Sequence, residues 1–130
     1  MTGLDTNVLV RFFAKDDTKQ FNRAQAFLAA LTPNAPGFVS LVALAEVTWV
    51  LQRRYGMKRV EIARVLEHLL NSPEVVIEGQ VAVAQALVQF GRAQSDFSDC
   101  LIERCGSVAG CKETVTFDKG AAKMAGMKLL

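Results

Sequence analysis

Acidic side chains beside apolar segments are the residues of this sequence that could do chemistry. Glu46 is the only charged residue in the otherwise mostly apolar stretch 41–51. An isolated ionised carboxylate in such surroundings is costly unless something positive pairs with it. Asp5, Asp99 and Asp118 also lie next to apolar residues, in segments far apart in the sequence. The economical explanation is that these acids converge on one divalent cation.

Magnesium and manganese suit such a set, because they take oxygen ligands, usually a few carboxylates together with waters and substrate phosphate. Asp5, Glu46 and Asp99 could supply the carboxylates. Asp96 lies three residues before Asp99 on the same helical face and could point into the same cavity. Without a cation, grouped acids would raise one another's pKa values. With one, they could hold the ion and orient a water for attack on phosphorus.

Four of these acids also have a purely structural interpretation. Asp5 could cap the end of a strand, and Asp96 could cap the start of a helix. Asp99 in a first helical turn could merely interact with the helix dipole, and Asp118 could be a turn or helix-start residue. The neighbouring hydroxyl and amide side chains could hydrogen-bond the acids from behind or be simple caps: Thr6, Asn7, Ser40 and Thr116.

Length and composition predict one domain spanning residues 1–130, with enough apolar residues for a full core. No stretch approaches the about 18–20 apolar residues of a membrane span, and the N-terminus lacks the pattern of a secretory signal. The three cysteines have no paired spacing, so we expect reduced thiols in a cytoplasmic protein. The net charge of +2 is weak evidence for nucleic acid, although cations placed among acids suit a phosphate-bearing polymer.

Apolar spacing and turn residues predict strands that alternate with helices. The strands are expected near 4–10, 38–39, 74–77, 114–116 and 127–130, and the helices at 18–31, 41–55, 57–70, 81–91, 96–105 and 119–124, with a loop at 106–110. This alternation indicates an α/β fold in which a parallel sheet is covered on both faces.

Sites in such sheets form at the carboxyl ends of the strands. Asp5, Ser40 and Asp118 lie at or just after predicted strand ends, whereas Glu46 should face inward about two turns into its helix. We expect Trp49 and Phe97 to lie in the core.

Several familiar sites are absent. The sequence has no Gly-x-x-x-x-Gly-Lys phosphate loop and no Gly-x-Gly-x-x-Gly motif. His68 is the only histidine and is predicted on a helix surface, which argues against a Ser-His-Asp set. An aspartyl-nucleophile phosphatase would have a second acid two residues after the first, where Asn7 stands here.

Four segments, in this order, resemble the PIN-domain family, and more narrowly its VapC-type toxins. They are Leu4-Asp5-Thr6-Asn7-Val8-Leu9, Leu44-Ala45-Glu46-Val47, Asp96-Phe97-Ser98-Asp99-Cys100-Leu101-Ile102 and Thr116-Phe117-Asp118. The resemblance covers nearly the whole chain. It implies a three-layer α/β/α fold with a central, mostly parallel sheet of 4–5 strands. Asp5, Glu46 and Asp99 match the family's metal-binding acids. Asp118 matches a fourth, more variable acid, and Asp96 matches an extra acid of one subgroup.

The same resemblance implies Mg²⁺- or Mn²⁺-dependent hydrolysis of RNA by the toxin of a toxin–antitoxin module. It further implies a homodimer, a cognate VapB-type antitoxin that blocks the site, and transfer RNA as the family-level substrate. Two alternatives stay open at this point. The acids could hold the arginine or lysine side chains of a partner in a non-catalytic binding module, or the enzyme could cut DNA or structured nucleic acid.

Overall fold

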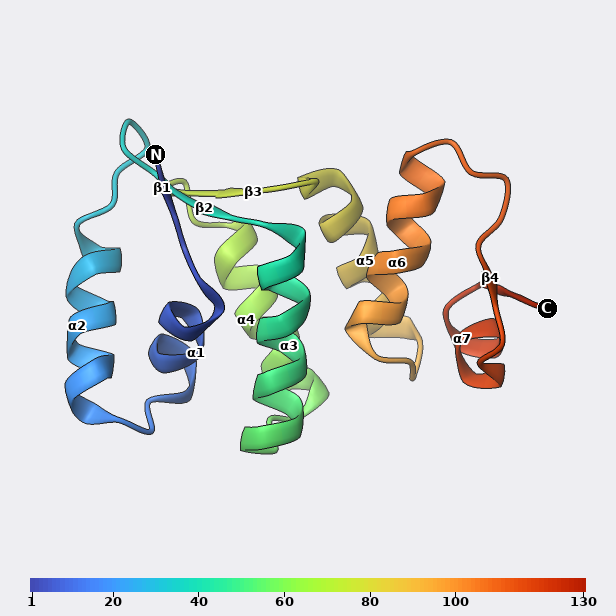
Figure 1. Cartoon of the computed structure of the whole chain (residues 1–130), viewed down its shortest axis with the longest axis horizontal. Helices are drawn as coiled ribbons and strands as arrows, with labels where there is room; N and C mark the ends of the chain where they lie inside the picture. Colours follow the sequence, from blue (N-terminus) through green and yellow to red (C-terminus); the bar gives the residue numbers. More distant parts are fainter. The chain divides into compact units, whose positions relative to one another are not determined.

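The computed structural model describes all of residues 1–130, and these form two compact units, residues 1–78 and 79–130. Figure 1 traces the elements along the chain. Unit 1 contains β1 (Thr2–Gly3), α1 (Thr6–Ala14), α2 (Thr18–Ala29), β2 (Gly37–Val39), α3 (Leu41–Tyr55), α4 (Arg59–Leu70) and β3 (Val75–Ile77). Unit 2 contains α5 (Gln80–Arg92), α6 (Phe97–Val108), β4 (Val115–Thr116), α7 (Lys119–Met124) and β5 (Lys128–Leu129).

The sheet of unit 1 has three parallel strands in the order β1-β2-β3. Gly3 lies opposite Phe38, and Phe38 lies opposite Val76. Parallel neighbours need long crossovers, and here α1 and α2 connect β1 to β2, while α3 and α4 connect β2 to β3. As a result, the residues that follow β1 and β2 lie at the same edge of the sheet, where sites of α/β proteins form.

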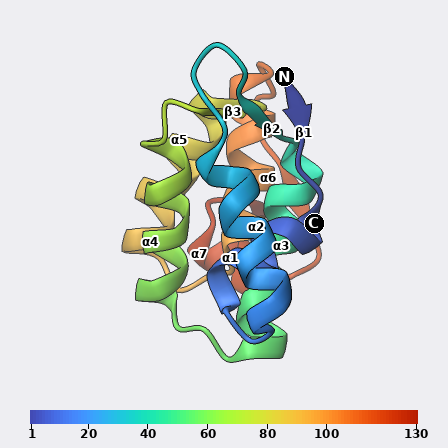
Figure 2. The ribbon, with the colours of Figure 1, turned by 90° about the vertical axis from the view of Figure 1, so that its left-hand side faces the viewer.

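The core of unit 1 lies between its helices. Leu9 of α1, Leu44 and Leu51 of α3 and Leu66 of α4 are fully buried. Burying one such side chain contributes about 1.5–3 kcal/mol. Helix α2 packs beside α1, as Figure 2 shows. The amphipathic spacing of these helices therefore produces the core that holds the sheet edge in place.

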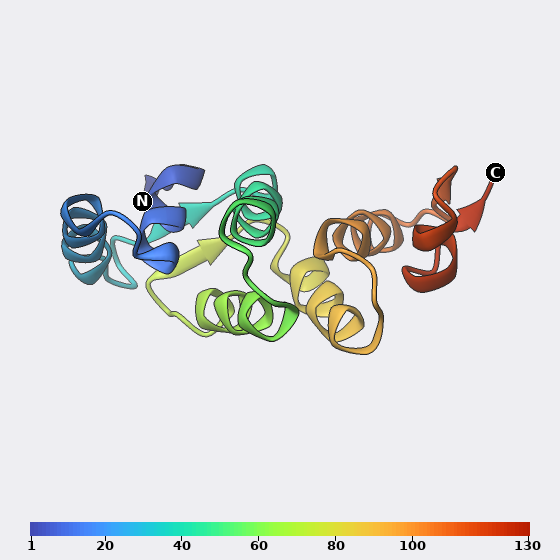
Figure 3. The ribbon, with the colours of Figure 1, turned by 90° about the horizontal axis from the view of Figure 1, so that it is seen from below.

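Unit 2 is built on the packing of α5 against α6, which lie side by side in Figure 3. Phe90 and Phe97 meet edge to face with their ring centroids 5.8 Å apart, a favourable aromatic geometry. Strands β4 and β5 pair in parallel, with Val115 opposite Lys128. Helix α7 connects them and buries Ala121 in a small cluster with the residues that follow the helix.

Helix termini follow the signals in the sequence. The Asp17 side chain accepts a hydrogen bond from the Gln20 amide at 2.9 Å, and α2 begins there. Gly56 ends α3 in the left-handed conformation, with φ of 62°, which glycine adopts without steric cost. The predicted helices at 18–31, 41–55, 57–70, 81–91 and 119–124 are all present with small changes of boundary.

The α/β fold with parallel strands is confirmed. The strands form one sheet of three and one sheet of two, and a single central sheet of 4–5 strands stays a prediction, as does a single domain over 1–130. Two local predictions are wrong. Residues 8–10 are helical, because a short apolar run occurs equally in a buried helix. Residues 106–108 extend α6 and are not a loop. No helix has the length and apolarity needed to cross a membrane.

Candidate functional site

Asp5 begins the site in unit 1. It is the N-cap of α1, directly after β1, yet its side chain makes no capping hydrogen bond and is exposed. The next residue, Thr6, is buried at the start of the helix, and Asn7 is exposed. A carboxylate that its own helix does not use, at the carboxyl end of a parallel strand, is available to bind a ligand.

Glu46 lies elsewhere than expected. Helix α3 buries the face formed by Ala43, Leu44, Val47, Thr48 and Leu51, and Glu46 falls outside that face and is exposed. The prediction of an inward-facing carboxylate is therefore wrong. The prediction of a core position for Trp49 is wrong as well, since its side chain is 51% exposed. An almost uniformly apolar sequence does not indicate which face of the helix is buried.

Two side chains accept hydrogen bonds from backbone amides at the start of α3. The Ser40 hydroxyl accepts a hydrogen bond from the Ala43 amide at 3.1 Å, so it is a helix cap. The carboxylate of Glu78 accepts one from the Leu41 amide at 2.9 Å. Sequence analysis missed Glu78, although its position directly after the apolar strand β3 is the same signal that singled out Asp5. Negative charge at this helix start is favourable.

Unit 2 brings three of the predicted acids together. Asp96 is the N-cap of α6, Asp99 lies half-buried in the first turn of α6, and Asp118 is the N-cap of α7. Burial raises the pKa of Asp99 above its usual range, and the negative charges of Asp96 and then Asp118 raise it further. The ionised form of Asp99 is therefore destabilised in the absence of a cation.

Hydrogen bonds hold Asp118 in place. Its carboxylate accepts one from the Ala121 amide at 3.0 Å, and its own amide donates one to the Thr116 hydroxyl at 3.0 Å. The helix-start interpretation of Asp118 is thus correct, and Thr116 fixes the turn that carries it. One carboxylate oxygen is used by the cap, while the second stays available for a ligand.

The predicted set of acids divides between the units, with Asp5 and Glu46 in unit 1 and the others in unit 2. Within either unit, no three histidine, cysteine, aspartate or glutamate side chains form a group that could hold a metal ion. A shared site for all five acids stays a prediction.

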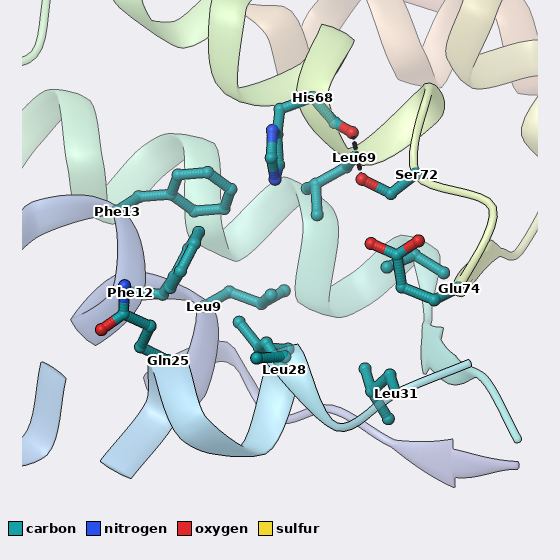
Figure 4. Close-up of a pocket in the computed structure, with 12 residues that line it drawn as sticks. Leu9, Phe12, Phe13, Gln25, Leu28, Leu31, His68, Leu69, Ser72 and Glu74 are labelled. Carbon is teal, nitrogen blue, oxygen red and sulfur yellow. Dashed lines mark hydrogen bonds between the residues drawn. The ribbon is translucent and has the colours of Figure 1, made fainter. Parts of the chain in front are cut away.

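Unit 1 also contains an apolar cavity of about 230 Å³ beside α1, α2 and α4. Figure 4 shows the rings of Phe12, Phe13 and His68 grouped on one side of it. His68 is on the helix surface as predicted, with its ring centroid 5.8 Å from that of Phe13. Apart from His68, only Glu74 among the lining residues is ionisable. The cavity is therefore suited to apolar contact and not to the acid chemistry described above.

Another hollow of unit 1, of about 480 Å³, lies beside Asn7. Arg11 and Arg23 line it together with Phe27, whose side chain is 44% exposed. Sequence analysis did not single out these residues, because α1 and α2 bring them together only in the folded unit.

The family assignment follows from comparison with known proteins. The family model of the PIN domain matches residues 4–127, and the chain belongs to the PIN-domain family. The chain is also 27% identical over 124 residues to a VapC ribonuclease of Aquifex aeolicus (strain VF5), an alignment that covers 95% of this chain and 92% of that protein. The resemblance inferred from the four motifs is confirmed.

Proposed function

We propose that this protein is a divalent-metal-dependent endoribonuclease, the toxin of a VapBC-type toxin–antitoxin module. Membership of the PIN-domain family and similarity to a VapC ribonuclease support the proposal. The observation that carries it is the environment of Asp99, whose charge is opposed by burial and by Asp96 and Asp118. Such perturbed carboxyl groups are typical of functional sites.

The donor set fits Mg²⁺ or Mn²⁺, because all of its members are carboxylates and a cation would relieve the repulsion around Asp99. Asp5 and Asp99 are the principal ligands in this proposal. Glu46 is a further ligand or the base that orients the attacking water. Asp118 assists through its second oxygen, and Asp96 contributes negative charge.

When bound, the cation stabilises charge on the phosphate oxygens. Side chains of the protein would carry out the other parts of the reaction. Glu46, being exposed, can accept a hydrogen bond from a water and align it with phosphorus. It would take the water's proton as the water oxygen bonds to phosphorus and the bond to the leaving RNA oxygen breaks, and the leaving oxygen would take up a proton from solvent. Thr116 holds the turn of Asp118, so that this acid does not need to be ordered when substrate arrives.

The proposed partners follow the same assignment. The substrate is RNA, with transfer RNA as the family-level expectation. A VapB-type antitoxin neutralises the enzyme in the cytoplasm, and the toxin is a homodimer. Growth arrest on induction of the chain alone, and rescue by the adjacent antitoxin gene, would support these partners. Tolerance of high expression would contradict them.

Asp5→Asn tests the chemistry, because it removes the charge of a proposed ligand and leaves a residue that also suits a helix N-cap. We expect it to abolish Mg²⁺-dependent RNA cleavage while the circular dichroism spectrum is kept. Asp17→Asn is the matched control, since Asp17 caps α2 and lies outside the site. Full activity of Asp5→Asn would refute the assignment. Parallel digestion of single-stranded DNA tests the choice of RNA.

A further inference from the structure

Unit 2 contains a hollow of about 610 Å³ whose lining is basic. We call it the basic hollow, and its lining residues are Gln85, Val88, Gln89, Arg92, Ala93, Arg104, Lys123 and Met124. These side chains come from α5, α6 and α7 and from the residue that follows α5. Three of them are cations, none is an acid, and none is aromatic.

Two of the cations are not neutralised by the protein. Arg92 and Lys123 are exposed, and neither charged group takes part in an ion pair or hydrogen bond. Arg104 differs, because its guanidinium donates to both carboxylate oxygens of Glu103, at 2.6 and 2.8 Å. The basic hollow therefore has a net charge that attracts an anion, and Arg92 and Lys123 supply it.

Hydrogen bonds connect the helices that line the basic hollow. The Gln89 amide nitrogen donates to the Ala125 carbonyl at 2.8 Å, which links α5 to the end of α7. Its amide oxygen is buried and has no hydrogen-bond partner. Arg104 also donates to the Gln85 amide oxygen at 3.4 Å, a long contact that bridges α6 and α5. The hollow is thus a formed part of unit 2.

The helices that bring cations to the hollow also carry the acids of unit 2. Asp99 and Arg104 are both on α6, and Asp118 caps the helix that carries Lys123. Five residues correspond to about 7.5 Å along the helix axis and about 140° around it, so the acids and the cations lie on different faces of the same helices. A polyanion such as RNA can contact the acids with one segment and the hollow with another, because its phosphates repeat along the chain.

We infer that the basic hollow binds a phosphodiester group of the RNA substrate away from the one that is cleaved, with Arg92 and Lys123 as positioning residues. This inference rests on the proposed ribonuclease function. An acidic protein segment is less well matched, because the anchor residues of tight protein interfaces are enriched in aromatic side chains, and the hollow has no aromatic residue. A phosphate needs only the cations and amide donors that are present.

The test uses the full-length Asp5→Asn protein in Mg²⁺, so that RNA stays intact, and measures the Kd of a labelled single-stranded RNA over a range of salt concentrations. Each phosphate contact on a single strand contributes about 0.7 to the slope of log K against log salt. We expect Arg92→Gln with Lys123→Gln to lower the slope by about 1.4 and to weaken binding on the order of tenfold at low salt. Lys19→Gln with Lys112→Gln removes the same charge from exposed positions outside the hollow and should leave the slope unchanged.

A second measurement uses the active enzyme, in which the hollow variant should raise KM and leave kcat nearly unchanged, as expected for uniform binding. Equal losses in both pairs of variants, or an unchanged slope in the hollow variant, would overturn the inference while the nuclease proposal stands. Weakened antitoxin binding with unchanged RNA binding would also overturn it and assign the hollow to a protein partner. If the unmutated enzyme cleaves no RNA, the proposed function fails first.

Discussion

The carboxylate of Asp99 has conflicting requirements. It is half-buried, and its neighbours Asp96 and Asp118 have the same charge, so folding makes its ionisation less favourable than that of an exposed aspartate. A carboxylate in such surroundings lowers the stability of the metal-free protein. It also favours cation binding, because a bound cation relieves the repulsion between the carboxylates.

We therefore expect Asp99→Asn to raise the Tm of the metal-free protein at neutral pH. The asparagine amide carries no charge, so neither the desolvation of a buried charge nor repulsion from Asp96 and Asp118 destabilises the folded state. For the parent protein, the raised pKa means that lowering the pH from neutral protonates Asp99 first in the folded state, so this residue stabilises the fold as acid is added. Thermal unfolding in EDTA measures the effect, with Asp17→Asn as control. A lower Tm for Asp99→Asn would show that its charge stabilises the fold.

At the scale of elements, one polar network joins three helix ends of unit 1. Arg11 near the end of α1 donates to the Tyr55 hydroxyl at 2.9 Å, and this hydroxyl donates to Asp16 at 2.7 Å. Arg11 also pairs with Asp16 at 3.1 Å. The hydrogen bond from Tyr55 is the main cause of a lowered pKa of Asp16, and the Arg11 charge adds to it. All three groups are near solvent, so the network positions the helices more than it stabilises them.

Tyr55→Phe should lower the free energy of unfolding at pH 7, because it removes the hydrogen bond and keeps the ring. A lowered pKa means that the contribution of Asp16 is present above its unfolded pKa and is lost as the pH falls through the folded value. The difference between variant and parent should accordingly shrink when the pH is lowered from 7 to well below the ordinary pKa of an aspartate. Urea unfolding of both proteins at pH 7 and at the acidic pH measures this difference in the free energy of unfolding. A difference that is the same at both would mean that Tyr55 acts only through packing.

At the scale of the whole molecule, the proposed acids are contributed by both units, with Asp5 and Glu46 before residue 79 and Asp99 after it. A cation held by both sets would stabilise the folded chain by mass action. The same cation held by one unit alone would depend on the acids of that unit only.

We expect Mg²⁺ to raise the Tm of the parent protein, and either Asp5→Asn or Asp99→Asn to reduce that increase strongly. The change in Tm between EDTA and excess Mg²⁺ is the measurement, and Asp17→Asn should retain the full increase. An undiminished response in Asp5→Asn would place the ion with the acids of unit 2 and would exclude the shared site.

Local patterns determined much of this protein before any fold was considered. The order of helices and strands after residue 17, the caps at Asp17 and Ser40, the stop at Gly56 and the four acidic motifs depend on residues close together in the chain, so they can be predicted from it. Only the tertiary structure decided that Glu46 is exposed, that Asp118 raises the pKa of Asp99, and that Arg92 and Lys123 share one hollow. These features depend on which helix face is buried and on which helices pack together, and an apolar run such as 41–51 is compatible with burial of more than one face.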